Sequence, residues 1–522
     1  MISAPKKTTD TLKRKLNTKR RRPSALPLST GYTPPIPIYK HQRTAIELAV
    51  RKQALGVFDD PGMGKTLQGV LIADCITTAM REAERIFILC KSAHAGVWVQ
   101  HFADYAPHLR VQSVVGKSAD KRKWHRRTNV HIINYELLQR AAGKGAPLTQ
   151  FPNGTYLRLN EDAARVIRIA TKHGPSVMLA DESHYFKTPT SNITKFMMAA
   201  SCAFTRRYIF TGTPVAERPE DVWSQLYVLD QGKTLGRSYA AFKNRYCIMR
   251  DTQYGPKVCG HRHKRELHCK LKSVSVRRLK KNCLDLPAKV PKVTNVQRTA
   301  EHEGFMRSAR DTLLQALHQY KGNTIYTRKG TSVAAALTAY RKVCAMPSTV
   351  HPTTVRGSKY HALVDIMQQE SAPIVVWCDH VSVVQEVARA LTEDGYRVAT
   401  VYGKIKHKVR DTIVHDFEHG AYDWLIATQS AMREAVTITN SQHAIYFEFS
   451  WQLLNWTQSQ DRLHRIGQKG TVVINRMFLD GSLDAYMYDV LCEKERSASE
   501  INDGKRYPAV LSKQRLLECL AW

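Results

Sequence analysis

The sequence predicts an α/β protein with two tandem lobes, each built on a parallel, doubly wound sheet, and a helical insertion between them. Three observations predict this fold class. The length of 522 residues suffices for two to four domains at about 150 residues each. Short apolar strands alternate with helical stretches in two separate parts of the chain, which is typical of a parallel sheet. Between about residues 230 and 350, basic helical stretches replace that alternation.

The alternation begins with a helix expected over residues 39–53, followed by a short strand at Val57-Phe58 and a second helix from Lys65 onward. Further strands are expected on short apolar runs at residues 85–89, 131–133, 177–180, 374–377, 398–401, 424–427 and 444–447. We therefore divide the chain into a basic disordered tail at 1–30, a first lobe at 31–235, a helical protrusion and linker at 236–350, a second lobe at 351–480 and a C-terminal helical segment at 481–522.

The composition excludes several classes of protein. Hydrophobic residues at 43% and charged residues at 24% argue against a disordered, collagen-like or coiled-coil chain. No apolar run reaches the roughly 18 residues that a membrane helix needs, so we expect no membrane contact. The eleven cysteines contain no C-x-x-C pair and the N-terminus has no apolar leader, which favours free thiols in a reducing compartment. That compartment would be the cytoplasm or nucleoid of a bacterial or viral system, or the nucleus of a eukaryote.

The net charge of +34 comes from 79 Lys and Arg against 45 Asp and Glu. Residues 1–23 hold nine of the basic side chains and a single acid, and a run of this kind is typically solvated and disordered. The charge on the remaining chain predicts a positive surface. Phosphate backbones are the commonest partner of such a surface, so the charge favours nucleic acid.

A glycine-rich turn predicts a phosphate-binding loop. Gly62-Met63-Gly64-Lys65-Thr66 follows a strand and opens a helix, so its backbone N–H groups and the helix dipole favour an anion. Lys65 would reach the β- and γ-phosphates, and the Thr66 hydroxyl would bind Mg²⁺. Asp59 stands where the strict pattern has its first glycine, and a simple glycine turn is the alternative reading.

Two acids follow the buried strand at 177–180. Asp181 would hold Mg²⁺ and Glu182 would polarise the attacking water. Adjacent acids on a surface are common, but a pair at the carboxyl end of a strand about 115 residues behind a phosphate loop favours a nucleotide site. Together the two elements predict an NTPase.

Further motifs occur in an order that resembles the SWI/SNF-type DNA translocases of helicase superfamily 2, over about residues 38–480. The family also has an acid in place of the first P-loop glycine, so Asp59 supports the resemblance. The matching segments are Tyr39–Gln42, Asp60–Gln68, Leu89–Ser92 with Val97-Trp98, Ile133–Glu136, Asp181–His184 with Phe186-Lys187, Thr211–Pro214, Glu220–Leu226, Arg277–Lys280 with Leu286–Lys289, Arg341–Cys344 and Gln458–Gln468.

The resemblance implies two RecA-like lobes that use ATP and Mg²⁺. Arg462 and Arg465, three residues apart, are expected on one face of one helix and would reach the γ-phosphate held by the other lobe. The implied catalytic residues are Lys65, Asp181, Glu182, Arg462 and Arg465, and the implied Mg²⁺ ligands are Thr66 and Asp181. The implied nucleotide-binding residues are Gln42, Pro61, Gly62, Met63, Gly64, Lys65, Thr66 and Gln458.

The resemblance also implies a DNA-dependent ATPase that moves along double-stranded or branched DNA as a monomer. Thr211 and Thr213 would link the nucleotide state to the DNA face. DNA contacts, mostly to phosphates, would come from Lys91, Ser92, Asn134, Tyr135, His380, Lys404 and Thr428.

Within the family, Glu266–Leu271 (E-L-H-x-x-L) and the linker resemble the branch that anneals strands, reverses forks or migrates branches. We see no added reader module, which favours a bare motor of bacterial or viral type. Two alternatives stay open: a helicase that separates DNA or RNA strands, and a catalytically weak DNA-binding scaffold. The second is left open by residues Thr428–Ile438, which lack the glycines of the family's motif V.

Cysteines and histidines between residues 259 and 269 are candidate zinc ligands. Cys259, His261 and His263 alternate along the chain, and His268-Cys269 follows. The spacing is irregular, with no second pair at the distance of a zinc ribbon or finger, so we do not predict zinc from the sequence.

Overall fold

The computed structural model describes residues 26–115, 128–140, 148–172, 174–251, 255–319, 332–370, 373–433, 437–504 and 520. The chain divides into two compact units, which we call lobe 1 (residues 1–285 and 497–506) and lobe 2 (residues 286–496 and 507–522). The predicted region at 236–350 is thus shared between the units. Residues 1–25 of the expected basic tail, and Glu434–Val436 of the altered motif V, lie outside the described residues.

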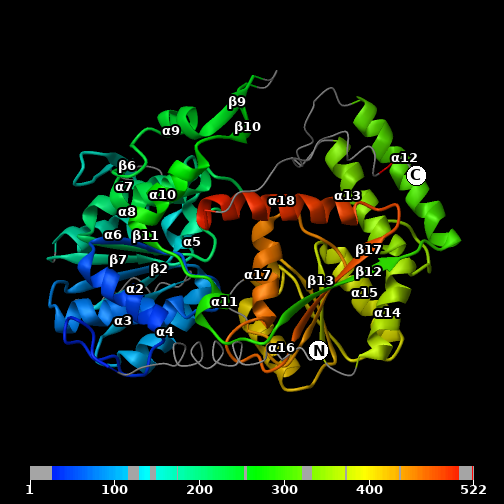
Figure 1. Ribbon diagram of the computed structural model, residues 1–522, viewed down its shortest axis with the longest axis horizontal. Helices are drawn as coiled ribbons and strands as arrows, with labels where there is room; N and C mark the ends of the chain where they lie inside the picture. The colour runs from blue at the N-terminus through cyan, green and yellow to red at the C-terminus, as the bar shows by residue number, and fades with distance from the viewer. Residues whose placement is uncertain are drawn as a thin grey trace, which may run out of the picture. The chain divides into compact units, whose positions relative to one another are not determined.

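Lobe 1 is built on a parallel sheet of seven strands in the order β11-β1-β8-β7-β2-β4-β3. Three of these strands, β2, β7 and β11, are labelled in Figure 1. The strands are β1 (Ala54–Val57), β2 (Arg85–Cys90), β3 (Val111–Val114), β4 (Val130–Asn134), β7 (Ser176–Ala180), β8 (Arg206–Phe210) and β11 (Ser275–Val276). The α-helices are α2 (Lys40–Arg51), α3 (Lys65–Asp74), α4 (Ser92–Tyr105), α5 (Tyr135–Leu138), α6 (Glu161–Lys172), α7 (Asn192–Ala200), α8 (Asp221–Asp230), α9 (Tyr239–Tyr246), α10 (Lys264–Val274) and α11 (Lys280–Cys283).

The order of three neighbouring strands positions the predicted chemistry. β1, β8 and β7 lie side by side, and all three run in the same direction. The P-loop follows β1, Thr211 follows β8 and Asp181 follows β7. Because parallel strands end at one edge, the sheet delivers these three segments to the same place. All five residues of β7 are buried, as expected for a strand covered on both faces.

Lobe 2 has a second parallel sheet, with six strands in the order β12-β17-β16-β13-β15-β14. The strands are β12 (Lys289–Val296), β13 (Ile374–Cys378), β14 (Val398–Val401), β15 (Trp424–Thr428), β16 (His443–Tyr446) and β17 (Val472–Leu479). The α-helices are α12 (Ala300–Gln319), α13 (Ser332–Ala345), α14 (Ser358–Gln369), α15 (Val381–Glu393), α16 (His407–Glu418), α17 (Leu453–Leu463) and α18 (Asp484–Asn502).

Two small antiparallel pairs add to lobe 1: β5 (Leu148–Gln150) with β6 (Tyr156–Arg158), and β9 (Cys247–Arg250) with β10 (Lys257–His261). Short helical turns of 3₁₀ or π type complete the described elements at Cys75–Ala79, Ser183–Phe186, Ser201–Ala203, Pro347–Thr349 and Ala431–Arg433. Among the described helices, none is both long and apolar enough to cross a membrane.

The predicted fold class is confirmed, and every strand predicted from an apolar run exists within a few residues. β12 was missed. It pairs with β17 along all eight residues, but most of its side chains are exposed and it contains Pro291. An edge strand with a proline and no apolar run gives little periodic signal, so we assigned this segment to the linker.

Helix α3 packs unusually close to α4. A Cβ on Gly69 would lie 2.5 Å from Trp98 Cη2, and Trp98 Nε1 donates a 3.0 Å hydrogen bond to Asp181. We predict that Gly69→Ala lowers the free energy of unfolding by about 1–3 kcal/mol through overpacking, measured by urea denaturation. Gly96→Ala is the control, since it lies in helix α4 with nothing within 4 Å of its Cβ. The control should be neutral or stabilising by up to about 1 kcal/mol, and equal effects at the two sites would contradict the prediction.

Strand β4 contains a buried histidine, His131. Burial lowers its pKa to about 4, and Arg85 acts in the same direction. Between pH 6.5 and 4 the unfolded chain therefore binds a proton that the folded chain does not. Stability is complete above about pH 6.5 and falls toward pH 4, by up to about 3 kcal/mol from this residue. We predict that His131→Phe flattens the pH dependence of the urea midpoint, whereas exchange of the exposed His415 leaves it unchanged.

Candidate nucleotide-binding and catalytic site

The P-loop joins β1 to α3 in lobe 1. Gly62 and Gly64 adopt positive φ angles of 79° and 76°, which glycine tolerates without steric cost. The Lys65 ammonium donates to the carbonyl oxygens of Asp59 at 2.8 Å and Asp60 at 3.2 Å. Burial lowers the pKa of Lys65, while the carboxylates of Glu182, Asp59 and Asp181 oppose that shift. The predicted lysine therefore lies among the acids at the carboxyl ends of the strands.

The first turn of α2 contacts the P-loop. Gln42 Nε2 donates to the Met63 carbonyl at 3.4 Å, and His41 Nε2 lies 3.1 Å from the same oxygen. Gln42 Oε1 accepts a 3.0 Å hydrogen bond from Tyr39 N. A Cβ on Gly64 would come within 2.5 Å of Gln42 Nε2. The structure thus brings together the predicted nucleotide-binding residue Gln42 and the predicted phosphate loop.

Asp181 is held by helix α4. Its Oδ2 accepts a 3.0 Å hydrogen bond from Trp98 Nε1 and lies 3.1 Å from His94 Nδ1, while Oδ1 accepts from Glu182 N at 3.0 Å. The role of His94 was not predicted, because no spacing in the sequence links it to Asp181. The hydroxyl of Thr66 and the carboxylate of Asp181 are hard oxygen donors, which fit Mg²⁺ better than a softer metal.

Glu182 has a left-handed backbone, with φ 48°. Such strain in a non-glycine residue is concentrated at functional sites. Burial alone would raise the pKa of Glu182, but the hydrogen bond and charge of His184 and the charge of Lys65 lower it overall. Glu182 therefore remains a carboxylate at neutral pH.

The predicted coupling residues lie next to Glu182. Thr211 Oγ1 donates to Glu182 Oε2 at 3.3 Å and lies 3.1 Å from His184 Nδ1. Thr213 N in turn donates to Thr211 Oγ1 at 3.1 Å. The loop after β8 is thus connected to the acid after β7 through a single hydroxyl.

An arginine from the linker neutralises Asp59. Arg278 Nε and Nη2 donate to the two carboxylate oxygens of Asp59 at 2.8 and 2.7 Å, and Arg278 Nη1 donates to the His41 carbonyl. Gln68 Nε2 adds a 3.2 Å hydrogen bond to Asp59. The Asp59 side chain is fully buried, so the residue that breaks the strict P-loop pattern is half of a buried, bidentate ion pair.

The preceding arginine joins the same region to the end of α18. Arg277 Nη1 donates to the carbonyls of Phe58 at 2.8 Å and Gly212 at 3.1 Å. Its Nη2 lies 3.3 Å from Asp60 Oδ1, and its Nε donates to Asp503 Oδ1 at 2.6 Å. The sequence identified these arginines as linker residues, but gave no sign that they contact the P-loop.

In lobe 2, the predicted arginines do not share a helix. Arg462 lies in α17 and is buried, and its Nε donates to the Gln458 carbonyl at 3.3 Å. Helix α17 ends at Leu463, so the prediction that Arg465 continues the same helix is wrong. The chain turns there toward Gly467, which has φ 104°. Burial lowers the pKa of Arg465 and Asp461 opposes this shift.

A network of charges fixes the loops at the carboxyl edge of the second sheet. Burial would raise the pKa of Glu448, but hydrogen bonding and charge from His380, with Arg341, lower it to about 2. Glu448 also accepts hydrogen bonds from the backbone N–H groups of Asp379 and His380, both at 3.0 Å. Arg341 Nη2 donates to Asp379 Oδ2 at 2.8 Å and to the Phe449 carbonyl at 2.7 Å. The network thus connects the loops after β13 and β16.

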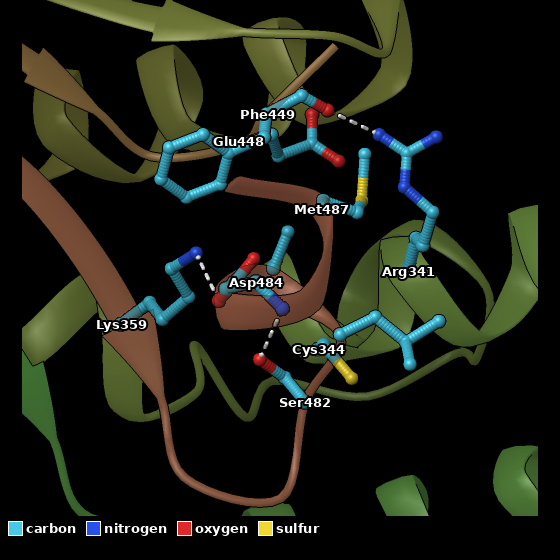
Figure 2. A pocket seen from close by; sticks show the side chains of 10 residues that line it. Arg341, Cys344, Lys359, Glu448, Phe449, Ser482, Asp484 and Met487 are labelled. Atoms are coloured by element: carbon cyan, nitrogen blue, oxygen red, sulfur yellow. Dashed lines mark hydrogen bonds and ion pairs between the residues drawn. The ribbon is translucent and has the colours of Figure 1, made fainter. Parts of the chain in front are cut away.

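The small cavity beside this network is shown in Figure 2. Lys359, from α14, donates to Asp484 Oδ2 at 2.9 Å, and Asp484 N donates to Ser482 Oγ at 3.1 Å. The cavity measures about 10 Å³, close to what one water molecule needs. Arg341 and Cys344, from the R-K-x-C segment, line this cavity. Arg341 also bonds to the loops after β13 and β16.

The predicted DNA contacts fall into two groups. In lobe 1, Asn134 Nδ2 donates to Ser92 Oγ at 2.7 Å, and Lys91 Nζ lies 4.2 Å from the centroid of the Tyr185 ring. Tyr135 is buried and its hydroxyl donates to the Asp181 carbonyl at 2.6 Å. These residues follow the neighbouring strands β2 and β4.

In lobe 2 the corresponding residues follow three adjacent strands, β13, β15 and β14. His380 Nδ1 lies 2.7 Å from Glu448 Oε1. Lys404 is exposed, whereas Thr428 is buried. Exposure therefore distinguishes Lys404 from the other two. Each assignment to DNA remains a prediction.

Two family matches cover most of the chain. Residues 41–349 match the family described as SNF2-related domain. The chain belongs to the SNF2-related family. Residues 358–467 of this SNF2-related chain match the family described as helicase conserved C-terminal domain. The resemblance inferred from the motifs is confirmed, and the SNF2-related chain is an ATP-hydrolysing, helicase-like enzyme.

The curated relatives are more than twice as long as the region that this chain matches. The SNF2-related chain is 24% identical over 481 residues to the DNA annealing helicase and endonuclease ZRANB3 of Mus musculus, which covers 89% of this chain and 41% of that protein. It is 23% identical over 458 residues to the SWI/SNF-related matrix-associated actin-dependent regulator of chromatin subfamily A-like protein 1 of Xenopus tropicalis, covering 87% and 44%. The chain thus spans less than half the length of these relatives.

Two solved structures also align with the SNF2-related chain. The Sulfolobus solfataricus SWI2/SNF2 ATPase core in complex with dsDNA is 19% identical with a TM-score of 0.39, covering 92% of this chain and 95% of that one. The S. solfataricus SWI2/SNF2 ATPase core domain is 18% identical with a TM-score of 0.41, covering 96% and 99%.

The ion pair between Asp59 and Arg278 generates a stability prediction. Arg278→Ala would leave a buried carboxylate without its cation, which typically costs about 3–5 kcal/mol. Arg397→Ala is the matched control, because Arg397 pairs with Asp423 on the surface with side chains 60% and 47% exposed. The control should change the free energy of unfolding little, because exposed ion pairs contribute weakly to stability. Urea denaturation measures both, and similar losses would show that Asp59 does not depend on Arg278.

Proposed function

We propose that this protein is an ATP-dependent translocase on double-stranded DNA that remodels DNA structures by strand annealing, fork reversal or branch migration. The observation that carries the proposal is the Thr211 hydroxyl, which contacts both Glu182 and His184. This hydroxyl gives the acid that would activate water a direct connection to the loop after β8. A motor needs such a connection, because ATP hydrolysis has to change how tightly the protein binds a second ligand.

The P-loop region of lobe 1 would bind ATP. Lys65, now bonded to two P-loop carbonyls, would exchange them for phosphate oxygens, and Gln42 would contact the base. Pro61, Gly62, Met63 and Gly64 would form the phosphate cradle. Mg²⁺, held by Thr66 and Asp181, supplies charge neutralisation at the phosphates. Glu182, kept as a carboxylate, would accept the proton of the attacking water.

Lobe 2 would supply the positive charge that the transition state needs. Arg462 and Arg465 would contact the transferred phosphoryl group, with Gln458 beside the nucleotide. Because these residues belong to a different lobe from Lys65, hydrolysis would require both lobes to engage the same nucleotide.

DNA contacts would be mainly to phosphates and therefore sensitive to salt. Lys91 and Lys404 are the cations best suited to this role, and Ser92 and His380 would add polar contacts. Asn134, Tyr135 and Thr428 are buried, so we propose that they position the loops rather than bind phosphate by themselves. The motor would work as a monomer in the compartment that holds its DNA, either nucleoid and cytoplasm or nucleus.

The relatives support the DNA-remodelling part of the proposal. One is named a DNA annealing helicase and endonuclease, and the match covers the region that contains the ATPase motifs. Since this chain spans 41% of that relative, the endonuclease part of the name is not included in the proposal.

The test is ATP hydrolysis with and without duplex DNA. We predict that duplex DNA stimulates hydrolysis and that Glu182→Gln lowers the stimulated rate by about 10²–10⁴-fold, while DNA binding measured by fluorescence anisotropy persists. Glu84→Gln, an exposed exchange elsewhere in lobe 1, is the control and should retain the wild-type rate. Normal hydrolysis in Glu182→Gln would refute the assigned role of this acid.

A second set of assays separates the possible activities. Displacement of a triplex-forming strand reports movement without unwinding, a forked duplex reports strand separation, and a partly melted duplex reports annealing. Triplex displacement with annealing supports the proposal. Efficient strand separation of a plain fork favours a helicase, and hydrolysis that DNA does not stimulate favours a scaffold; either result would overturn the proposal.

A further inference from the structure

Three side chains that could bind a metal meet in lobe 1, away from the nucleotide site. The side-chain donor atoms of Glu220, Cys247 and His261 lie within 4.8 Å of one another. Glu220 lies at the N-terminus of α8, Cys247 begins β9 and His261 ends β10. The sequence spacing hides this group, because its members are separated by 27 and 14 positions.

A β-bulge brings His261 and Cys247 together. Along the β9–β10 pair the register runs from Lys257 opposite Arg250 to Val258 opposite Met249, and then shifts. After the shift His261 lies directly opposite Cys247. Without the extra residue, Gly260 would occupy that position. Residues opposite each other in an antiparallel pair present their side chains on the same face, so the bulge aims His261 at Cys247.

The third donor comes from outside the hairpin. His261 Nε2 lies 2.7 Å from Glu220 Oε2, with side chains 17% and 8% exposed. Cys247 is 2% exposed. The group therefore has a protected interior and a partly open side at the histidine, where a water molecule could approach.

We propose that Cys247, His261 and Glu220 bind a zinc-type divalent cation, with water in the fourth position. A thiolate, an imidazole and a carboxylate form a mixed set of sulfur, nitrogen and oxygen ligands that suits Zn²⁺ or Co²⁺. Mg²⁺ and Ca²⁺ prefer oxygen ligands alone. The ion would connect the β9–β10 hairpin to the start of α8.

Without a metal, the neutral thiol is the favoured form of Cys247. Burial raises the pKa of Cys247 to about 12, and the Glu220 carboxylate raises it further, while Lys243 and Arg262 oppose the shift. A divalent ion would stabilise the thiolate against this unfavourable environment and release its proton on binding.

The site differs from the zinc motif considered from the sequence. Cys259 is exposed, and its Sγ lies 3.3 Å from the Ile248 carbonyl. His268 Nδ1 lies 2.7 Å from the Ile501 carbonyl. Among the described residues, neither belongs to the group of potential ligands, which shares only His261 with the linear motif. This difference supplies matched controls on the same hairpin.

The experiment uses the full chain, purified with zinc and then dialysed. We expect about one zinc per chain by mass spectrometry of the metal. Replacement by Co²⁺ should give a near-ultraviolet thiolate-to-cobalt band. Cys247→Ser should abolish that band and His261→Gln should weaken metal binding by at least about tenfold. Cys259→Ser and His263→Gln should leave both the stoichiometry and the band unchanged.

X-ray absorption of the wild-type zinc form keeps the test independent of variant folding. One sulfur with three nitrogen or oxygen neighbours supports the site. A zinc content below about one tenth per chain with no cobalt band would overturn the proposal. So would metal that is lost in Cys259→Ser and His263→Gln but retained in Cys247→Ser, because the linear motif would then be the ligand set.

Discussion

The buried ion pair between Asp59 and Arg278 is the interaction on which the candidate site depends. A carboxylate removed from water is costly unless it is fully paired, and here two guanidinium hydrogen bonds and one from Gln68 satisfy it. The pair fixes the start of the P-loop from outside the loop itself. A glycine at this position would leave Arg278 without its carboxylate, which explains why an acid occurs in the predicted phosphate-binding loop.

The same region shows how one sheet edge assembles a site from distant segments. Trp98 and His94 hold one side of Asp181, and Thr211 holds Glu182. None of these contacts involves residues close in sequence. They arise because neighbouring parallel strands end together, so that the geometry of the sheet, and not the spacing of the motifs, determines which groups meet.

Predictions from the sequence succeeded where residues close together in the chain determine the local structure. Apolar runs predicted eight strands of the two sheets, and the glycine turn predicted the P-loop, but the buried strand β8 was not predicted. Such predictions failed where a structure depends on residues far away in the sequence. The edge strand β12 has no apolar run and is stabilised by pairing with β17. The end of α17 at Leu463, which places Arg465 outside the helix, was not predicted either. The group at Cys247 was also hidden, since a register shift of one residue decides which side chain faces it.

Helix α18 belongs to both lobes, since its residues 484–496 lie in lobe 2 and its residues 497–502 lie in lobe 1. There Glu500 pairs with Lys264 and Asp503 with Arg277. The chain therefore passes from one lobe to the other not only in the linker but also within this helix. A single proteolytic cut in the linker would leave residues 497–506, which belong to lobe 1, on the fragment that carries lobe 2. Neither lobe therefore has all its partners when it is expressed as one uninterrupted stretch of sequence.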